Sequence, residues 1–343
     1  MKISIAAFGE LMLRLSPPGR ERLLQSPRLE TNFGGGEANV AVSLARFGHS
    51  ARLISILPDH PLGDAAVGEL GRRGVGTSFI VRTGGRLGLY FSEPGSGPRP
   101  SEVLYDRDSS AFASAAPGTI DWDQALAGVD WFHTSGITPA LSRSAADLTR
   151  QALRACRSKG LKVSIDLNYR SKLWRYGVSA PEVMRDLFAH ADLGVANEED
   201  CRLALGFESA VFGPDGAVDA AAVEDLLGRV KAAFPRLEWM AVTLRESRSA
   251  DHNIWSAALL GRSGFRMGPR REIFPIVDRI GAGDAFSAGL IHGLHAFGSE
   301  EEALAFAVAA SALKHTIPGD FNLATESEVL AVMSGDVSGR IRR

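Results

Sequence analysis

The chain has 343 residues, of which 45% are hydrophobic and 23% are charged, and it carries 38 Lys and Arg against 40 Asp and Glu. The net charge of −2 excludes a globally basic nucleic-acid-binding protein, and the composition excludes disordered and collagen-like chains. The 2 cysteines, Cys156 and Cys201, form neither a disulfide framework nor a metal or redox spacing. These properties predict a soluble α/β protein of a reducing compartment.

No part of the sequence predicts a targeting or membrane segment. The short apolar run 1–8 ends at Gly9-Glu10, which favours a buried first strand over a signal peptide. No uncharged apolar run approaches the ~20 residues of a membrane-spanning helix. We therefore expect a cytoplasmic protein with no membrane partner.

Strand-like and helix-like runs alternate along most of the chain. The predicted strands cover 2–8, 51–57, 129–134, 161–167, 192–196 and 237–244. The predicted helices cover 37–47, 60–73, 142–158, 180–189, 198–205 and 218–233. Such alternation predicts βαβ units, a mostly parallel sheet and a three-layer αβα core.

Two regions break this rhythm. Residues 10–33 and 85–112 each read as strand, turn and strand, with Gly- and Pro-rich turns. They predict a discontinuous β lid on an α/β core made of 1–9, 34–84 and 113–343. Because exposed strand edges commonly pair with another subunit, the lid also predicts a homo-oligomer, most simply a dimer.

Polar residues follow several predicted strands. They lie in the runs 133–136, 166–170, 197–200 and 243–245. Ligands of parallel sheets bind outside the carboxyl ends of the strands, so these residues predict one polar rim for a phosphorylated or sugar-like ligand.

The sharpest local signal is the loop Asp278-Arg279-Ile280-Gly281-Ala282-Gly283-Asp284 before a predicted helix. A glycine-rich turn at a helix N-terminus exposes amides that hold an anion. Asp284 on the first turn is either a proton acceptor or only a helix cap. Amides and a carboxylate at one helix end suit phosphoryl transfer.

A second glycine run, Gly34-Gly35-Gly36, precedes the helix that carries Asn39. The glycines permit close approach to a ligand and Asn39 could donate to a hydroxyl, or the run is a hinge between lid and core. It lacks the G-x-G-x-x-G spacing of a dinucleotide fold, and no Gly-Lys pair of a Walker A loop occurs.

These two motifs resemble the signatures of the ribokinase superfamily, also called the phosphofructokinase-B (pfkB) carbohydrate kinases, and the resemblance covers almost the whole chain. It implies a ribokinase-like fold with Asp284 as catalytic base and the amides of Gly281, Ala282 and Gly283 as anion hole. It also implies ATP, a divalent cation, usually Mg²⁺, and often a monovalent cation such as K⁺ near the second signature.

Within that family, four segments resemble kinases of 2-keto-3-deoxygluconate: 133–141, 166–174, the lid residues around Tyr90 and Tyr105, and 318–320. The substrate residues implied are Gly34, Gly35, Asn39, Tyr90, Tyr105, Arg107, Arg170, Asp284 and Asp320. The two arginines suit a carboxylate of an acid sugar, although either could instead form a surface ion pair.

Two segments depart from the family pattern. The magnesium-organising Asn-x-x-Glu element reads Asn197-Glu198-Glu199-Asp200, so Asp200 or Glu199 would hold the metal through water. The glycine-rich nucleotide loop reads Thr243-Leu244-Arg245-Glu246-Ser247, so the phosphates would meet side chains. The nucleotide residues implied are Asn168, Asn197, Thr243, Arg245, Ser247, Gly281 and Gly283.

The leading hypothesis is ATP-dependent phosphorylation of the C6 hydroxyl of 2-keto-3-deoxygluconate. The galactonate epimer and neutral acceptors (fructose, ribose or a nucleoside) are alternatives within the family. A dinucleotide-dependent dehydrogenase is disfavoured by the missing fingerprint. A catalytically silent sugar-binding regulator is disfavoured by the intact Asp284 and kept open by the altered 243–247 run.

Overall fold

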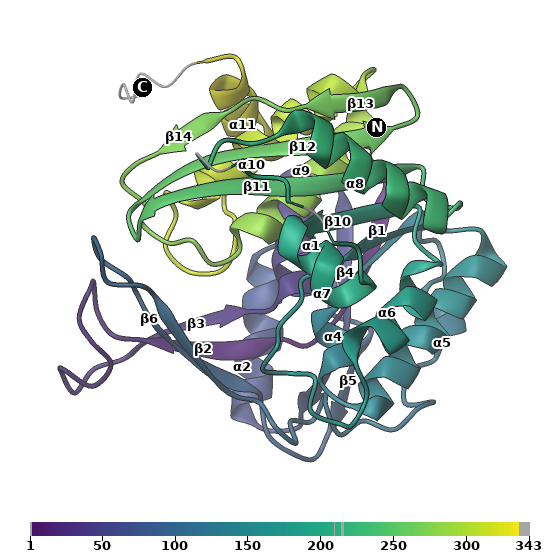
Figure 1. The fold of residues 1–343 in the computed structure, drawn as a ribbon. Helices are drawn as coiled ribbons and strands as arrows, with labels where there is room; N and C mark the ends of the chain where they lie inside the picture. The colour runs from purple at the N-terminus through teal and green to yellow at the C-terminus, as the bar shows by residue number, and fades with distance from the viewer. Residues whose placement is uncertain (1, 209, 214–215, 336–343) are drawn as a thin grey trace.

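A large, mostly parallel sheet forms the centre of the computed structural model, which describes residues 2–208, 210–213 and 216–335. Ten strands take part, in the order β13-β12-β11-β10-β9-β8-β1-β4-β5, with β14 also pairing β12 (Figure 1). The strands are β1 Ser4–Phe8, β4 Ser50–Pro58, β5 Ile80–Thr83, β8 Trp131–Ser135, β9 Lys162–Asp166, β10 Leu193–Asn197, β11 Trp239–Ser249, β12 His252–Gly261, β13 Gly264–Met267 and β14 Arg271–Ile273. From β5 to β11 all neighbours are parallel.

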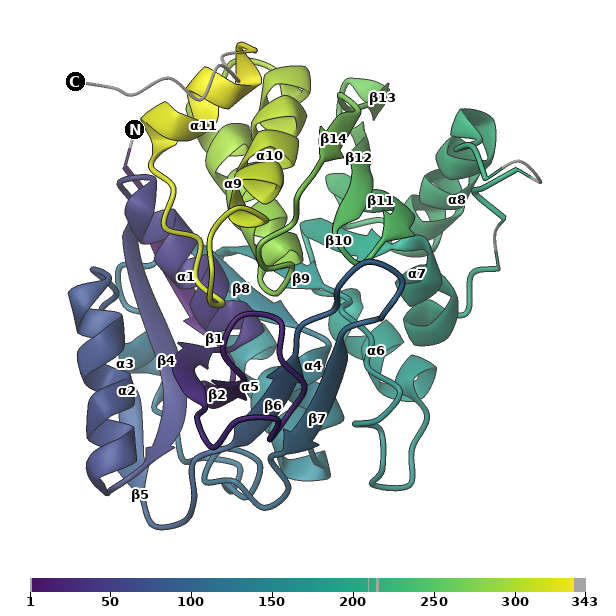
Figure 2. The same cartoon turned by 90° about the vertical axis from the view of Figure 1, so that its left-hand side faces the viewer.

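Helices cover both faces of this sheet, as Figure 2 shows. One face carries α1 Gly36–Arg46, α2 Pro61–Arg72, α9 Ala282–Ala296, α10 Glu300–Lys314 and α11 Glu326–Met333. The other carries α3 Trp122–Ala125, α5 Arg143–Lys159, α6 Ala180–Phe188, α7 Glu198–Leu205 and α8 Ala220–Ala233, and the short α4 Ile137–Ala140 precedes α5. Strands covered on both faces become continuous apolar runs, and β8 accordingly is buried at every position. The predicted three-layer α/β fold is confirmed.

A second sheet projects from the side of this core (Figure 1). Its order is β3-β2-β6-β7, built from β2 Met12–Ser16, β3 Glu30–Gly34, β6 Leu89–Glu93 and β7 Glu102–Asp106. The core elements α1, β4, α2 and β5, within residues 36–83, are inserted between β3 and β6, so the second sheet is formed by two separate chain segments. We call this four-stranded sheet the lid sheet.

The structure adds elements that periodicity did not reveal. The strand predicted for 237–244 continues to Ser249 and turns back antiparallel into β12, with Arg245 opposite Trp255. The short elements β5, β13, β14, α3, α4 and α11 were not predicted, because three to eight residues carry too little pattern. The end of the sequence, from Ser334 on, predicts a frayed tail, and residues 336–343 of it lie outside the described residues. No helix in the described ranges is long and apolar enough to cross a membrane.

A buried histidine pair links α1, β4 and α9. The His49 Nε2 and His292 Nδ1 atoms are 2.9 Å apart, and His295 lies beside them. Burial, together with the charges of neighbouring histidines, lowers the pKa of each of His49 and His292 to about 4. The pair is therefore neutral in the folded protein at neutral pH.

Acid should weaken the fold through this pair. Between pH 6.5 and about 4 the unfolded chain binds protons at these histidines while the folded chain does not, so stability falls as pH falls. We expect the free energy of unfolding, measured in urea, to drop less from pH 7.5 to pH 5 in a His292→Phe variant than in the parent chain. A variant of the partly exposed His252, His252→Gln, is the control; an unchanged pH slope in His292→Phe would contradict the assignment.

Candidate active site

A cavity of about 330 Å³ lies at the carboxyl ends of β8 to β11, between the core and the lid sheet. Most residues singled out in the sequence line it. These are Gly35, Asn39, Tyr90, Tyr105, Arg107, Asn168, Arg170, Asn197, Asp200, Thr243, Arg245, Gly281, Ala282, Gly283, Asp284 and Asp320. Gly34, Glu199 and Ser247 do not line it. The parallel strands thus bring together residues that are far apart in the chain.

The glycine loop ends at the N-terminus of α9. Gly281 has φ 83°, in the left-handed region, and a Cβ there would lie 2.1 Å from the Asp320 carbonyl oxygen. The Ala282 amide makes a 3.3 Å contact with the carbonyl of Arg279. Since the first amides of a helix lack intrahelical acceptors, this end of α9 offers N–H donors to an anion in the cavity.

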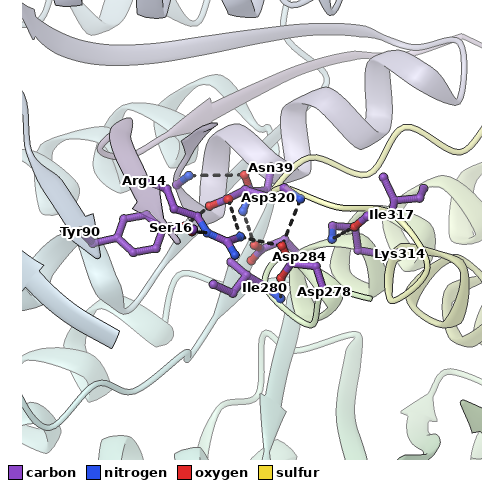
Figure 3. Close-up of polar contacts among 12 residues, drawn as sticks. Arg14, Ser16, Asn39, Tyr90, Asp278, Ile280, Asp284, Lys314, Ile317 and Asp320 are labelled. Atoms are coloured by element: carbon purple, nitrogen blue, oxygen red, sulfur yellow. Dashed lines mark hydrogen bonds and ion pairs between the residues drawn. The ribbon is translucent and has the colours of Figure 1, made fainter. Parts of the chain in front are cut away.

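Asp284 follows on the first turn of α9 and is only 9% exposed. Its Oδ2 accepts a 2.7 Å hydrogen bond from Asn39 Nδ2, and Asn39 Oδ1 in turn accepts from the Gly35 amide at 3.3 Å. Asn39, predicted as a donor to a ligand hydroxyl, therefore orients Asp284 (Figure 3). Burial raises the pKa of the Asp284 carboxyl to about 7, although the Asn39 bond and the Arg170 charge oppose the rise.

Glu37 is a fully buried carboxylate close to Asp284 that the sequence did not single out. Its Oε1 accepts from Ser135 Oγ at 2.7 Å and Thr138 Oγ1 at 2.8 Å. Burial raises the pKa of Glu37, and its negative charge helps to raise that of Asp284. An acidic residue directly after the glycine run, at the start of a helix, was the sequence feature that could have indicated a role for Glu37.

Asp166 and Asp200 form an acidic part of the cavity wall. Burial and the charges of Asp200 and Asp284 raise the pKa of Asp166 well above its usual value, and burial raises that of Asp200 to about 6. Both Asp200 oxygens accept backbone amides, from Tyr169 at 3.0 Å and Asn197 at 3.1 Å. Asp166 was noted only as a strand end in the sequence.

These carboxylates fit a magnesium ion held partly through water and phosphate. Mg²⁺ keeps several waters and needs only one or two carboxylates, and a cation would relieve the mutual repulsion of Asp166 and Asp200. Glu199, the other residue suggested for a metal, is 64% exposed and pairs with Arg202. The described part of the chain has no group of three or more His, Cys, Asp or Glu arranged as a metal site.

The two predicted arginines differ in their surroundings. Arg107 is 3% exposed, and its Nε donates to Glu10 Oε2 at 2.8 Å, while Ser110 Oγ donates to the other Glu10 oxygen. Arg170 is exposed, donates to the Tyr169 carbonyl at 2.9 Å and forms no ion pair within the described ranges. Of these two arginines, Arg170 is therefore the one whose guanidinium can bind an anionic ligand without breaking an ion pair.

Breaking the Arg107–Glu10 pair should destabilise the protein. Arg107→Ala leaves the Glu10 carboxylate buried without its counter-charge, which typically costs about 3–5 kcal/mol of unfolding free energy. Urea denaturation measures this loss. The double variant Arg107→Met with Glu10→Gln should regain part of it, because no unpaired charge remains. A loss below about 1 kcal/mol for Arg107→Ala would contradict a buried ion pair.

Arg14 joins the lid sheet to the core. Its Nη1 donates to Asp278 at 2.8 Å and Asp320 at 3.1 Å, and the Tyr90 hydroxyl donates to Asp320 (Figure 3). Tyr90 and Asp320, both predicted to bind substrate, therefore bind each other. A Cβ on Gly34 would lie 1.9 Å from Asp320 Oδ1, which explains this glycine by close packing. No role for Arg14 was predicted from the sequence. A charged residue inside the apolar run 11–15 was the feature that could have indicated one.

One group of residues that line the cavity is aromatic and basic. The Trp255 and His315 rings lie 5.6 Å apart, and Arg245 and Arg279 line the same cavity. Thr243 Oγ1 makes a 3.4 Å contact with the Ala196 carbonyl. The run 243–247, predicted as an altered loop, is strand in the structure and belongs to β11. Ser247 shares the strand face of Thr243 and Arg245, but it lies two residues further along β11 and does not line the cavity.

Comparisons with known proteins agree on one family. The model of the pfkB family carbohydrate kinases matches residues 2–325. A 2-dehydro-3-deoxygalactonokinase of Haloferax volcanii is 37% identical, over 99% of both chains. A 2-dehydro-3-deoxygluconokinase of Bacillus subtilis is 27% identical, over 96% of this chain and 95% of its own. The crystal structure of a 2-dehydro-3-deoxygluconokinase from Thermotoga maritima superposes with a TM-score of 0.91 at 41% identity, covering 98% of this chain and 99% of that one.

Proposed function

Because the chain belongs to the pfkB family of carbohydrate kinases and is a sugar kinase, we propose that it transfers the γ-phosphoryl group of ATP to the C6 hydroxyl of 2-keto-3-deoxygluconate. The observation that carries the proposal is Asp284, a buried carboxylate oriented by Asn39 at the amide-bearing end of α9. A pKa of about 7 suits a general base at neutral pH.

In the proposed phosphoryl transfer, Asp284 is the proton acceptor. Asp284 takes the hydroxyl proton while the freed oxygen bonds the γ-phosphorus, and the bond from that phosphorus to the β,γ-bridging oxygen breaks to release ADP. The amides of Gly281 and Gly283 hold the negative charge of the phosphoryl group in transit. Magnesium, when bound near Asp166 and Asp200, supplies charge neutralisation for the phosphates.

The sugar carboxylate would meet Arg170, while Arg107, held by Glu10, shapes the wall under the lid sheet. A planar guanidinium binds a carboxylate through two parallel hydrogen bonds. A neutral sugar has no carboxylate to accept them. The nucleotide would lie at the opposite end, beside Thr243, Arg245, Trp255 and His315. The lid sheet would exclude water and so limit hydrolysis of ATP.

An acceptor screen tests this function. The purified chain with ATP and Mg²⁺ is offered 2-keto-3-deoxygluconate, its galactonate epimer, fructose, ribose and a nucleoside, and ADP release is measured. We expect kcat/KM for the acid sugars to exceed that for neutral acceptors by at least about 10²-fold. Equal rates with a neutral sugar would overturn the acid-sugar assignment.

The galactonate epimer is the second candidate acceptor. The observation that favours it is the 37% identity to the Haloferax volcanii enzyme that carries that name. The two acids differ in the orientation of one hydroxyl, so the same Arg170 contact serves both. The ratio of their kcat/KM values in the screen decides between them.

We also propose that the chain forms a homo-oligomer through the lid sheet. The edge strands β3 and β7 have no further strand beside them in the described part of the chain, and Leu104 on β7 is 52% exposed. Light scattering on a sizing column should give at least twice the chain mass of 36.6 kDa. A monomer would contradict this pairing.

A further inference from the structure

Lys314, the last residue of α10, is a lysine without solvent exposure. Its Nζ donates to the carbonyl oxygen of Ile317 at 2.9 Å (Figure 3). Lysine is almost never fully buried unless it is paired, because removing an ammonium from water is costly. The protein therefore retains this charge against a burial cost, and the proposed proton transfer does not use it.

The lysine lies directly beneath the glycine loop. A Cβ on Gly281 would come within 3.3 Å of Lys314 Cε, so the side chain packs against the residue that caps α9. Asp278 flanks the loop; its oxygens accept from the Ile280 amide at 3.0 Å, the Gly319 amide at 3.0 Å and Arg14. The ammonium thus sits between the loop that starts α9 and the loop that follows α10.

The surrounding charges keep Lys314 protonated. Burial lowers the pKa of its ammonium to about 8, while Asp278, Asp320 and Asp284 oppose this and Arg14 adds to it. At neutral pH the group is therefore mostly a cation. A fixed positive charge behind the loop favours negative charge held at its amides, because electrostatic interactions are stronger in a dry interior.

The family resemblance implies a monovalent cation near this loop, and the residues present do not fit one. The Ile317 carbonyl, which a K⁺ ion could use, already accepts the ammonium, and the Asp278 oxygens are taken by two amides and Arg14. We propose that the Lys314 ammonium takes the place of a monovalent cation beneath the glycine loop, so that activity does not depend on K⁺. Lys314 is then a positioning residue, and the proposal rests on the proposed kinase function.

The test compares the parent chain with Lys314→Met in buffers containing K⁺, NH₄⁺ or the bulky cation choline. The parent should turn over acid sugar at rates within about twofold in all three buffers. Lys314→Met should lose at least about tenfold in kcat in choline and regain part of it in K⁺ or NH₄⁺, whose ions fill the vacated space. Its melting temperature should rise with K⁺, whereas that of the parent should not.

Lys231→Met is the matched control. Lys231 lies on α8, away from the glycine loop, and it also donates to backbone carbonyls, those of Glu238 and Gly261. It should show no cation dependence. A parent enzyme activated tenfold or more by K⁺, or a Lys314→Met variant indifferent to all three cations, overturns the proposal. If Lys314→Met does not fold, the parent alone decides: K⁺-independent activity supports the proposal and K⁺ activation refutes it. If the parent phosphorylates no sugar, the proposed function fails, and the melting temperatures still test Lys314.

Discussion

Replacing Asp284 with asparagine should lower kcat by about 10³-fold while the fold remains intact. Asparagine keeps the size and the contact with Asn39 but accepts no proton, so the sugar hydroxyl attacks without a base. The substrate KM should change far less, because the loss falls on the transition state. Steady-state ADP release with 2-keto-3-deoxygluconate measures both constants. Turnover near that of the parent would exclude Asp284 as the base.

The same variant should be more stable than the parent at pH 8. A carboxyl whose pKa is raised by burial from 3.8 to about 7 costs stability as the pH rises from the unfolded to the folded value, and asparagine does not ionise. Melting curves at pH 5 and pH 8 test this sign. The expected gain at pH 8 also separates loss of chemistry from loss of fold.

Glu37→Gln is the matched control for a buried carboxylate in the same cavity. Glu37 bonds Ser135 and Thr138 and takes no proposed part in the proton transfer, so kcat should stay within about tenfold. The kcat/KM of the parent should rise with pH through about 7, as Asp284 loses its proton. In Glu37→Gln this midpoint should move to lower pH, because a negative charge near Asp284 is gone.

Replacing Arg170 with alanine should lower kcat/KM for the acid sugars by about 10²-fold. The variant removes a guanidinium that makes no hydrogen bond to a carboxylate in the described ranges and is proposed to bind the substrate carboxylate, and charged hydrogen bonds contribute about 1.5–3 kcal/mol each. Activity with fructose or ribose, where detectable, should change much less. Parallel kinetics with acid and neutral acceptors provide the ratio.

Arg175→Ala serves as the control for Arg170→Ala. Arg175 is an exposed arginine in the same loop after β9, and it lines a separate surface hollow with Tyr176 and Lys172. Its removal should leave acceptor preference unchanged. If Arg170→Ala lowers kcat/KM equally for acid and neutral sugars, Arg170 does not bind the substrate carboxylate.

Local pattern in the sequence was sufficient to predict the core fold and the place of the glycine loop at the start of a helix. Alternating apolar runs predicted the parallel sheet, because strands covered on both faces must be apolar throughout. The Gly281-Ala282-Gly283-Asp284 run predicted an anion-binding helix start, because glycine turns and helix N-termini act through adjacent backbone amides. Both signals are confined to neighbouring residues, and both elements lie where they were expected.

Long-range pairing was decided only by the tertiary structure. Arg14 meets Asp278 across 264 positions and Asp320 across 306, and no local spacing encodes such contacts. The lid pairing of β2 with β6 likewise depends on how the inserted core segment folds. The run 243–247 became strand because β12 returns alongside it, which local composition did not indicate.

Composition and charge determined that the chain is a near-neutral α/β protein, with 38 basic against 40 acidic side chains. Only the tertiary structure decided which of these charges are buried and which meet the cavity. Burial raises the pKa of Asp284 to about 7. The fold pairs Arg107 with Glu10, leaves Arg170 without a hydrogen-bonded carboxylate in the described ranges, and places Lys314 beneath the glycine loop. The physical reason is that the energy of a charge depends on its removal from water and on its neighbours, and folding sets both.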